Sequence, residues 1–244
     1  IKKEVNLKSR SSFNEILLIK DKESISSKLK DLGYYFADID TSVEELRDNK
    51  VNLIFNISIN KKAKIKKISF IGNKIYKDKK LKSIILSEEY KFWKFLSGKK
   101  FLNEAMIDYD KRLLKNFYLN KGYFNVEVNS SFAKMINDQE FELIFNIQAN
   151  PKLYFGKLKL NLPTDFSESN YDSLNKFFDK LENEPYSLYN VENIIEKIET
   201  ITVYEQYESI KATVEENIVD NKIDISFNIE ETEKMFIERI NIFG

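Results

Sequence analysis

The sequence contains no cysteine and no histidine, and its 244 residues include only three prolines and six glycines. Without cysteine, neither disulfide bonds nor thiolate metal sites can form. Without histidine, the usual general base and the commonest protein ligand for metals near neutral pH are both missing. These absences exclude thiol catalysis and soft-metal sites, and they leave only carboxylates, lysines, tyrosines and hydroxyl groups for chemistry.

Other familiar signals are also missing. The glycines form no G-x-G-x-x-G motif, and Gly98-Lys99 lacks the upstream glycine of a phosphate-binding loop, because Trp93 stands there. Acidic and basic residues balance, at 39 each, which gives little support for nucleic-acid binding. No stretch approaches the roughly 20 apolar residues of a membrane-spanning helix. Ile1 does not open a signal peptide, so we expect the chain to be part of something longer.

Carboxylate pairs are the remaining candidates for acid–base chemistry or for a hard-metal site. The clearest are Asp108 with Asp110 and Glu88 with Glu89. Such clusters are usually solvated surface, and we interpret them in that way. We therefore assign no catalytic, cofactor-binding or metal-binding residue, and we predict a protein that is not an enzyme and needs no cofactor.

What the sequence does contain is a repeat. Phe-Asn-Ile occurs at 55–57, 145–147 and 227–229, at intervals of 90 and 82 residues, and a second apolar segment begins thirteen residues after each phenylalanine. A third landmark is the pair Gly33-Tyr34, which recurs as Gly122-Tyr123. A period of this length predicts a tandem array of small domains.

The middle repeat begins with a strand and two helices. A short strand containing Ile68 should end at Gly72, because Gly-Asn suits a turn with positive φ. Apolar residues at helical spacing predict a short helix from Lys79. Asn103 can cap a longer helix that Gly122 closes.

Two strands should complete the middle repeat. Apolar and polar residues alternate over 124–132 and again over 141–147, as expected of strands with one buried face. The connection 133–140 carries Asn-Asp and predicts a hairpin. The repeat therefore reads β-α-α-β-β, which is an α+β fold.

The other repeats follow the same order. The first should have its long helix over 14–32 but lacks its first strand. In the third, Ser187 is the predicted helix cap and the last two strands lie at 210–214 and 223–229. The predicted domains are 1–60, 64–149, 152–231 and 235–244, the last being only the start of a module.

This tandem of β-α-α-β-β modules resembles the POTRA domains of BamA-type outer-membrane assembly proteins. The resemblance rests on the Gly-Asn strand end, the helix exit Lys121-Gly122-Tyr123 and the short linkers. The modules resemble parts of the second to fifth POTRA domains, and 88–101 resembles an insertion in the third. The resemblance implies a three-stranded mixed sheet covered by two helices in each module. The third repeat departs from the pattern at Gln206 and at 161–163.

The resemblance also implies a function. It predicts a non-catalytic scaffold in the periplasm of a Gram-negative bacterium, the soluble arm of an outer-membrane protein whose own C-terminal membrane barrel is absent from this chain. Expected partners are unfolded outer-membrane protein precursors and the lipoproteins of the assembly complex, and not nucleic acid. The alternative is the POTRA arm of a transporter for one secreted or translocated substrate, of the two-partner secretion or TamA type, although those carry two and three modules.

Edge strands are the first candidate partner-binding surface. The family pattern places the second strand of each module at a free sheet edge, where an added peptide strand would gain main-chain hydrogen bonds with little demand on its sequence. The alternative is that charge and twist merely protect the edge. The candidate residues are Phe124, Asn125, Val126, Glu127, Val128, Asn129, Ile210, Lys211 and Ala212.

An aromatic loop is the second candidate surface. Such a cluster either packs back onto its own helices or anchors a partner, because aromatic side chains supply many interface anchors. Solvent exposure of Trp93 would decide between the two. The candidate residues are Tyr90, Phe92, Trp93 and Phe95.

Overall fold

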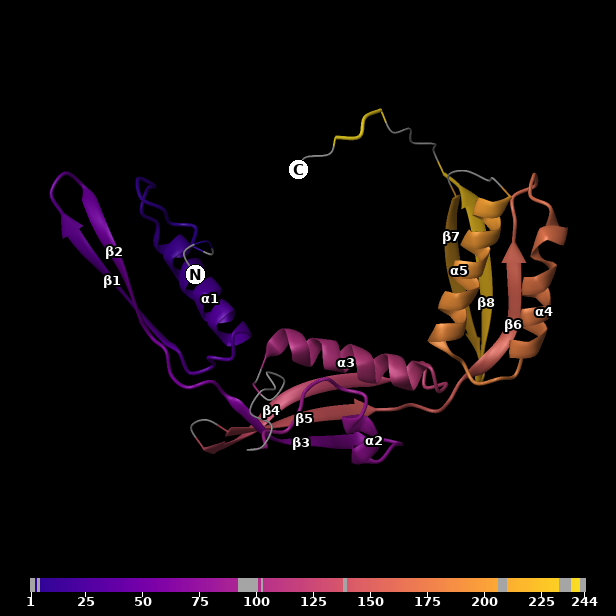
Figure 1. The fold of residues 1–244 in the computed structure, drawn as a ribbon, viewed down its shortest axis with the longest axis horizontal. Helices are drawn as coiled ribbons and strands as arrows, with labels where there is room; N and C mark the ends of the chain where they lie inside the picture. Colours follow the sequence, from indigo (N-terminus) through magenta and orange to yellow (C-terminus); the bar gives the residue numbers. More distant parts are fainter. Residues whose placement is uncertain are drawn as a thin grey trace. The chain divides into compact units, whose positions relative to one another are not determined.

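The computed structural model describes residue 3 and residues 5–91, 101, 103–137, 140–205, 210–232 and 238–241. The chain divides into two compact units. The first comprises Ile1–Leu114 and Glu127–Gln148, and the second comprises Lys115–Val126 and Ala149–Gly244. Figure 1 labels the helices and strands of each.

The first unit begins with a helix and a hairpin. Helix α1 (Glu15–Asp31) is followed by β1 (Asp38–Leu46) and β2 (Lys50–Ser58), which pair antiparallel. Asp48 and Asn49 turn the hairpin with positive φ, as a tight turn between twisted strands requires. Helix α1 lies within the predicted range 14–32, and the Asn14 side chain caps it by accepting the Ile16 and Leu17 N–H groups. The small core contains Ile25, Leu29 and Ile39, with Phe55 and Ile57 packed against it.

The same unit contains a three-stranded sheet. Along the chain come β3 (Lys64–Asn73), α2 (Asp78–Lys82), α3 (Glu104–Leu119), β4 (Glu127–Asn137) and β5 (Glu140–Gln148). Strand β5 is central, parallel to β3 and antiparallel to β4. The predicted β-α-α-β-β order and mixed sheet are confirmed.

Alternation and capping explain these elements. Strand β5 buries every second side chain, from Phe141 to Ile147, as a strand with one covered face must. The Asn103 carboxamide accepts the Met106 N–H at 2.8 Å and caps α3. Gly122 has φ +91°, and after it the Tyr123 N–H donates back to the Tyr118 carbonyl. Both predictions for the ends of this helix are confirmed.

The bounds predicted for the strand over 124–132 were wrong at both ends. Strand β4 starts at Glu127, because the chain makes a second turn after Gly122, in which the Val126 N–H donates to the Tyr123 carbonyl. The strand then continues to Asn137, through residues predicted as a hairpin loop. The alternation of apolar and polar residues extended the predicted strand to Phe124, because a turn can also bury every second side chain.

The second unit repeats the arrangement. Its elements are β6 (Tyr154–Asn161), α4 (Asp172–Leu181, preceded by a 3-10 turn), α5 (Leu188–Tyr204), β7 (Ile210–Val219) and β8 (Lys222–Glu231). The sheet order is β6-β8-β7, with β8 parallel to β6 and antiparallel to β7. Helix α4 lies along β6 and α5 along β7 (Figure 1). The core contains Val191, Ile194 and Ile198 of α5 with Ile223, Ile225, Phe227 and Ile229 of β8.

Helix α5 takes part of its cap from the end of α3. Ser187 accepts the Asn190 N–H, as predicted for a cap, at 3.4 Å. The Asn120 carboxamide oxygen accepts the Tyr189 N–H at 2.7 Å and the Ser187 hydroxyl at 3.2 Å. Asn120 therefore satisfies a helix N-terminus 69 residues away.

Asn120→Ala should lower the free energy of unfolding of the second unit by about 1 kcal/mol, because an N–H at the start of α5 loses its acceptor. Urea unfolding followed through the amide signals of α5 and β8 measures this change. Asn116→Ala, the same substitution at an exposed position of α3, is the control and should have little effect. Equal effects of the two variants would contradict the capping role.

Some predictions fall on residues that are not described. Gln206 is one of them. Of the predicted module start at 235–244, only 238–241 is described, and these residues form no regular secondary structure. Among the described residues, no helix combines the length and the apolar character needed to cross a membrane.

Candidate functional site

Strand β4 forms one edge of the sheet β3-β5-β4, and strand β7 forms one edge of the sheet β6-β8-β7. Glu127, Val128 and Asn129 open β4, and Ile210, Lys211 and Ala212 open β7. In the described part of the chain, β4 pairs only with β5 and β7 only with β8. The structure thus places these six predicted residues on sheet edges, and their binding of partners stays a prediction.

Phe124, Asn125 and Val126 do not belong to this edge. They precede β4, and the Phe124 ring packs edge-on against Tyr186 of the second unit, with ring centroids 4.9 Å apart. Val126 is buried. Their predicted place in an edge strand is therefore wrong, because they lie in the turn that follows α3.

The two faces of β7 differ in polarity. Ile210, Ala212 and Val214 point to the core side, where they are partly buried and pack against the core of the second unit. Lys211 and Glu215 alternate with them and are exposed. The β7 edge is therefore apolar on the face toward the core and charged on the opposite face.

The opposite edge of each sheet is occupied by the chain itself. At β6, the Phe155 N–H donates to the Glu184 carbonyl at 2.8 Å, and the Phe155 carbonyl accepts the Asn183 N–H at 2.9 Å. At β3, the Ile65 carbonyl accepts the Tyr90 N–H at 2.6 Å. In each sheet, a loop of the same module therefore bonds the beginning of the outer strand.

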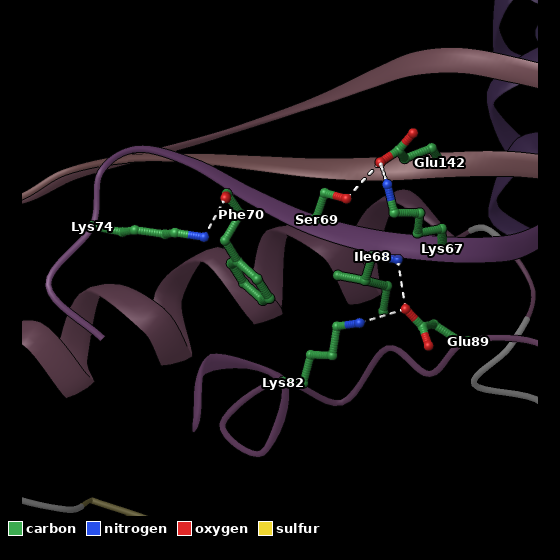
Figure 2. Close-up of polar contacts among 8 residues, drawn as sticks. All are labelled: Lys67, Ile68, Ser69, Phe70, Lys74, Lys82, Glu89 and Glu142. Atoms are coloured by element: carbon green, nitrogen blue, oxygen red, sulfur yellow. Dashed lines mark hydrogen bonds and ion pairs between the residues drawn. The ribbon is translucent and has the colours of Figure 1, made fainter. Parts of the chain in front are cut away.

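Further along β3, charged side chains replace the loop backbone (Figure 2). The Glu89 carboxylate accepts the Ile68 N–H at 3.0 Å and is held by Lys82 at 2.5 Å. The Lys74 ammonium donates to the Phe70 carbonyl at 2.8 Å. We call Glu89 and Lys74 the edge caps of β3.

A second polar cluster in Figure 2 joins β3 to its neighbour β5. The Glu142 carboxylate of β5 accepts hydrogen bonds from the Lys67 ammonium at 2.8 Å and from the Ser69 hydroxyl at 2.5 Å. Lys67 and Ser69 alternate with Ile68 and Phe70 along β3, so they lie on the face opposite the core. This cluster holds the pairing of the two strands, and the edge caps hold the outer side.

Hydrogen bonding sets the charge of the Glu89 carboxylate. Burial alone would raise its pKa, but the hydrogen bonds from Lys82 and from the Ile68 N–H outweigh burial and lower the pKa below its ordinary value. The same hydrogen bonds that favour the ionised form make Glu89 a charged, and therefore strong, acceptor for the strand.

The aromatic loop is described only at its ends. Tyr90 belongs to the covered edge of β3, because its N–H bonds Ile65 and its ring lies 4.4 Å from the Lys64 ammonium. Phe92, Trp93 and Phe95 lie outside the described residues. Their role as a partner-binding surface stays a prediction.

The interpretation of the carboxylate pairs as solvated surface was wrong for Asp110. Its side chain is 0% exposed and accepts the N–H groups of Leu86 at 2.6 Å and Ser87 at 3.1 Å. Asp108 is exposed and pairs with Lys111 on the same helix. In the part of the chain that is described, no cluster of three or more acidic, histidine or cysteine side chains could hold a metal ion.

The edge caps were missed by sequence reasoning. Glu89 was considered only as part of an acidic pair, and Lys74 and Lys82 were not singled out. A usable signal exists, since Lys74 directly follows the predicted strand end at Gly72-Asn73.

Comparisons with known proteins agree with the fold and the repeat. The family model POTRA, described as surface antigen variable number repeat, matches residues 1–59 and 63–150. The outer membrane protein assembly factors BamA of Neorickettsia risticii and of Buchnera aphidicola subsp. Acyrthosiphon pisum are 23% and 25% identical over 98% and 99% of this chain. The chain spans 34% and 39% of their lengths.

A solved structure shows the same fold. The crystal structure of Haemophilus influenzae BamA POTRA3-5 aligns with a TM-score of 0.53 at 17% identity, covering 94% of this chain and 89% of that one. The family model covers more than half of the 244 residues. The chain therefore belongs to the POTRA family, and its modules resemble those of BamA-type outer-membrane assembly factors.

Proposed function

We propose that this chain is a periplasmic, non-catalytic scaffold of a BamA-type outer-membrane assembly factor. In this proposal, β4 and β7 guide unfolded outer-membrane protein precursors by pairing with their extended segments. The observation that carries it is the unequal edges of each sheet. The chain itself bonds the outer side of β3 and β6, whereas β4 and β7 pair only with their central strands within the described residues.

The chemistry of strand addition suits a scaffold with many clients. An edge strand offers unpaired N–H and C=O groups, and a peptide that bonds them needs no particular sequence. The difference between the two faces of β7 adds a mild preference for peptides that alternate apolar and polar residues. Apolar residues at alternate positions of the added peptide would lie beside Ile210, Ala212 and Val214 on the core side. Strands of outer-membrane proteins alternate in this way.

Partner lipoproteins complete the proposal. The relatives from Neorickettsia risticii and Buchnera aphidicola are named outer membrane protein assembly factors, which supports a place for this chain in an assembly complex. The modules then dock the lipoproteins of that complex through surfaces other than the two edges, which leaves the edges open to precursors.

A peptide titration into the full chain tests the proposal. We expect an extended peptide from an outer-membrane strand to shift the amide signals of β4 and β7. Glu127→Ala should change the affinity little, because side chains contribute little to backbone pairing. Neighbouring residues point their N–H groups to opposite edges, so only one of Val128→Pro and Asn129→Pro removes an outward donor. That variant should weaken binding to β4 about tenfold or more.

Circular dichroism is the control, since the other proline variant breaks the pairing with β5 and disturbs the fold. Binding at β4 that survives both proline variants in folded protein would contradict backbone recognition. Shifts confined to the helices, with β4 and β7 silent, would move the function to another surface.

A further inference from the structure

The first strands of the two sheets close their outer edges by different means. At the start of β6, the loop backbone bonds Phe155 and also Leu153, the residue just before the strand, whose carbonyl accepts the Tyr186 N–H at 3.0 Å. At β3, the described part of the loop bonds the Ile65 carbonyl through the Tyr90 N–H and bridges Lys64 through Phe101, and the edge caps Glu89 and Lys74 bond the strand beyond these residues. Within the described residues, the β3 edge beyond Ile65 is therefore closed by charged side chains.

The capped groups are those that an incoming strand would use. Ile68 and Phe70 are two residues apart, so their backbone groups point to the same edge. An added strand pairs with such neighbouring groups, and here the Ile68 N–H and the Phe70 carbonyl already have charged partners. Charge-assisted hydrogen bonds are roughly twice as strong as neutral ones, so a neutral peptide backbone competes poorly for these groups.

The caps can be removed without removing the strand. The side chains of Lys74, Lys82 and Glu89 keep 30%, 36% and 26% of their surface exposed. Ile68 and Phe70, in contrast, bury their side chains in the core. Loss of the caps should therefore uncover the edge while β3 stays in the sheet.

We propose that Glu89 and Lys74 are specificity-determining residues that keep β3 closed and reserve strand addition in this sheet for β4. This inference rests on the proposed function, since it concerns which edge of the sheet accepts the added peptide strand. Lys82 acts through Glu89, because its ammonium fixes the carboxylate that bonds the Ile68 N–H. Without the caps, β3 becomes a second acceptor of extended peptide.

The double variant Glu89→Ala, Lys74→Met tests the proposal in the full chain. An extended peptide of about ten residues, the length of an outer-membrane strand, is titrated while amide signals are followed. In the unmodified chain, β4 and β7 should shift and β3 should not. In the variant, the amides of β3 around Ile68 and Phe70 should shift as well, with an affinity within about tenfold of that of β4, because both edges then offer the same backbone groups.

Two matched substitutions separate edge closure from loss of charge. Glu89→Gln keeps an acceptor for the Ile68 N–H and should leave β3 silent. Lys79→Met removes an exposed lysine of the neighbouring helix α2 and should behave like the unmodified chain. If the double variant fails to fold, Glu89→Ala alone replaces it, with the same expectation for β3.

The outcomes distinguish this inference from the proposed function. Peptide shifts at β4 with β3 silent in the uncapped variant would overturn the role of the caps and leave strand addition intact. Shifts at β3 in the unmodified chain would also overturn it. Silence of β4 and β7 in every protein would overturn the proposed function itself.

Discussion

Asp110→Ala should lower the free energy of unfolding of its module by about 3 kcal/mol, because two backbone donors lose one buried acceptor. The carboxylate is fully buried, and its two oxygens accept the N–H groups of Leu86 and Ser87. Alanine cannot replace these bonds, and Ser87 lies where water does not reach it. Urea unfolding followed through the amide signals of α3 and β5 measures the loss.

A neighbouring aspartate supplies the control. Asp108→Ala removes an exposed carboxylate whose ion pair with Lys111 lies on the helix surface, and such pairs contribute about 0–1 kcal/mol. Asp110→Asn keeps one acceptor oxygen and should fall between the two. Equal losses for Asp108→Ala and Asp110→Ala would refute the bridging role.

The same device occurs in the first helix–hairpin pair. Asp21 follows its helix cap Asn14 by the same seven residues that separate Asn103 from Asp110, and it accepts the N–H groups of Asn6 and Leu7. Burial alone would raise the pKa of Asp21, but these hydrogen bonds lower it below its ordinary value of 3.8. A lowered pKa stabilises the fold above that ordinary value, and the contribution is lost as the pH falls through the lowered one.

The third repeat shows what the sequence could and could not reveal about this device. Seven residues after its cap Ser187 stands Ile194, which is fully buried in the core. The position is therefore buried in all three copies, and an isoleucine there marks it as a core position. The same comparison could have identified Asp21 and Asp110 as buried carboxylates, since a solvated residue rarely aligns with a core isoleucine.

Local signals predicted the elements, and contacts distant in sequence decided the rest. The sequence alone predicted the caps at Asn103 and Ser187 and the alternation in β5 and β8, because these signals act within a few residues. The start of β4 depended on a turn after Gly122 that alternation cannot distinguish from a strand. The edge caps depended on a loop that brings Glu89 to Ile68, 21 residues away. Nothing local to Glu89 specifies that contact.

Gly72→Ala should destabilise the sheet of β3, β4 and β5 by about 3 kcal/mol or more, because two penalties act at one position. Gly72 has φ +89°, which an L side chain rarely adopts. A methyl group there would also lie 2.5 Å from the Ile147 carbonyl oxygen and would clash with the Asn146 carboxamide. The Asn146 side chain can turn aside, but Ile147 belongs to the central strand, which is paired on both sides. Urea unfolding followed at β3 and β5 measures the loss.

Gly122→Ala separates the two penalties. Gly122 has nearly the same dihedral angle, φ +91°, but a methyl group there would lie 3.1 Å from the Leu153 carbonyl oxygen and 3.3 Å from Pro185. That variant should therefore lose about 1 kcal/mol or slightly more, chiefly from the backbone angle. In Gly72→Ala, adding Asn146→Ser should recover only part of the loss, because the clash with the Ile147 carbonyl remains. If Asn146→Ser restored the full free energy of unfolding, or if the two glycine variants lost equal free energy, the central strand would be able to move away from the added methyl group. The close approach of β3 to β5 at Gly72 would then not be required.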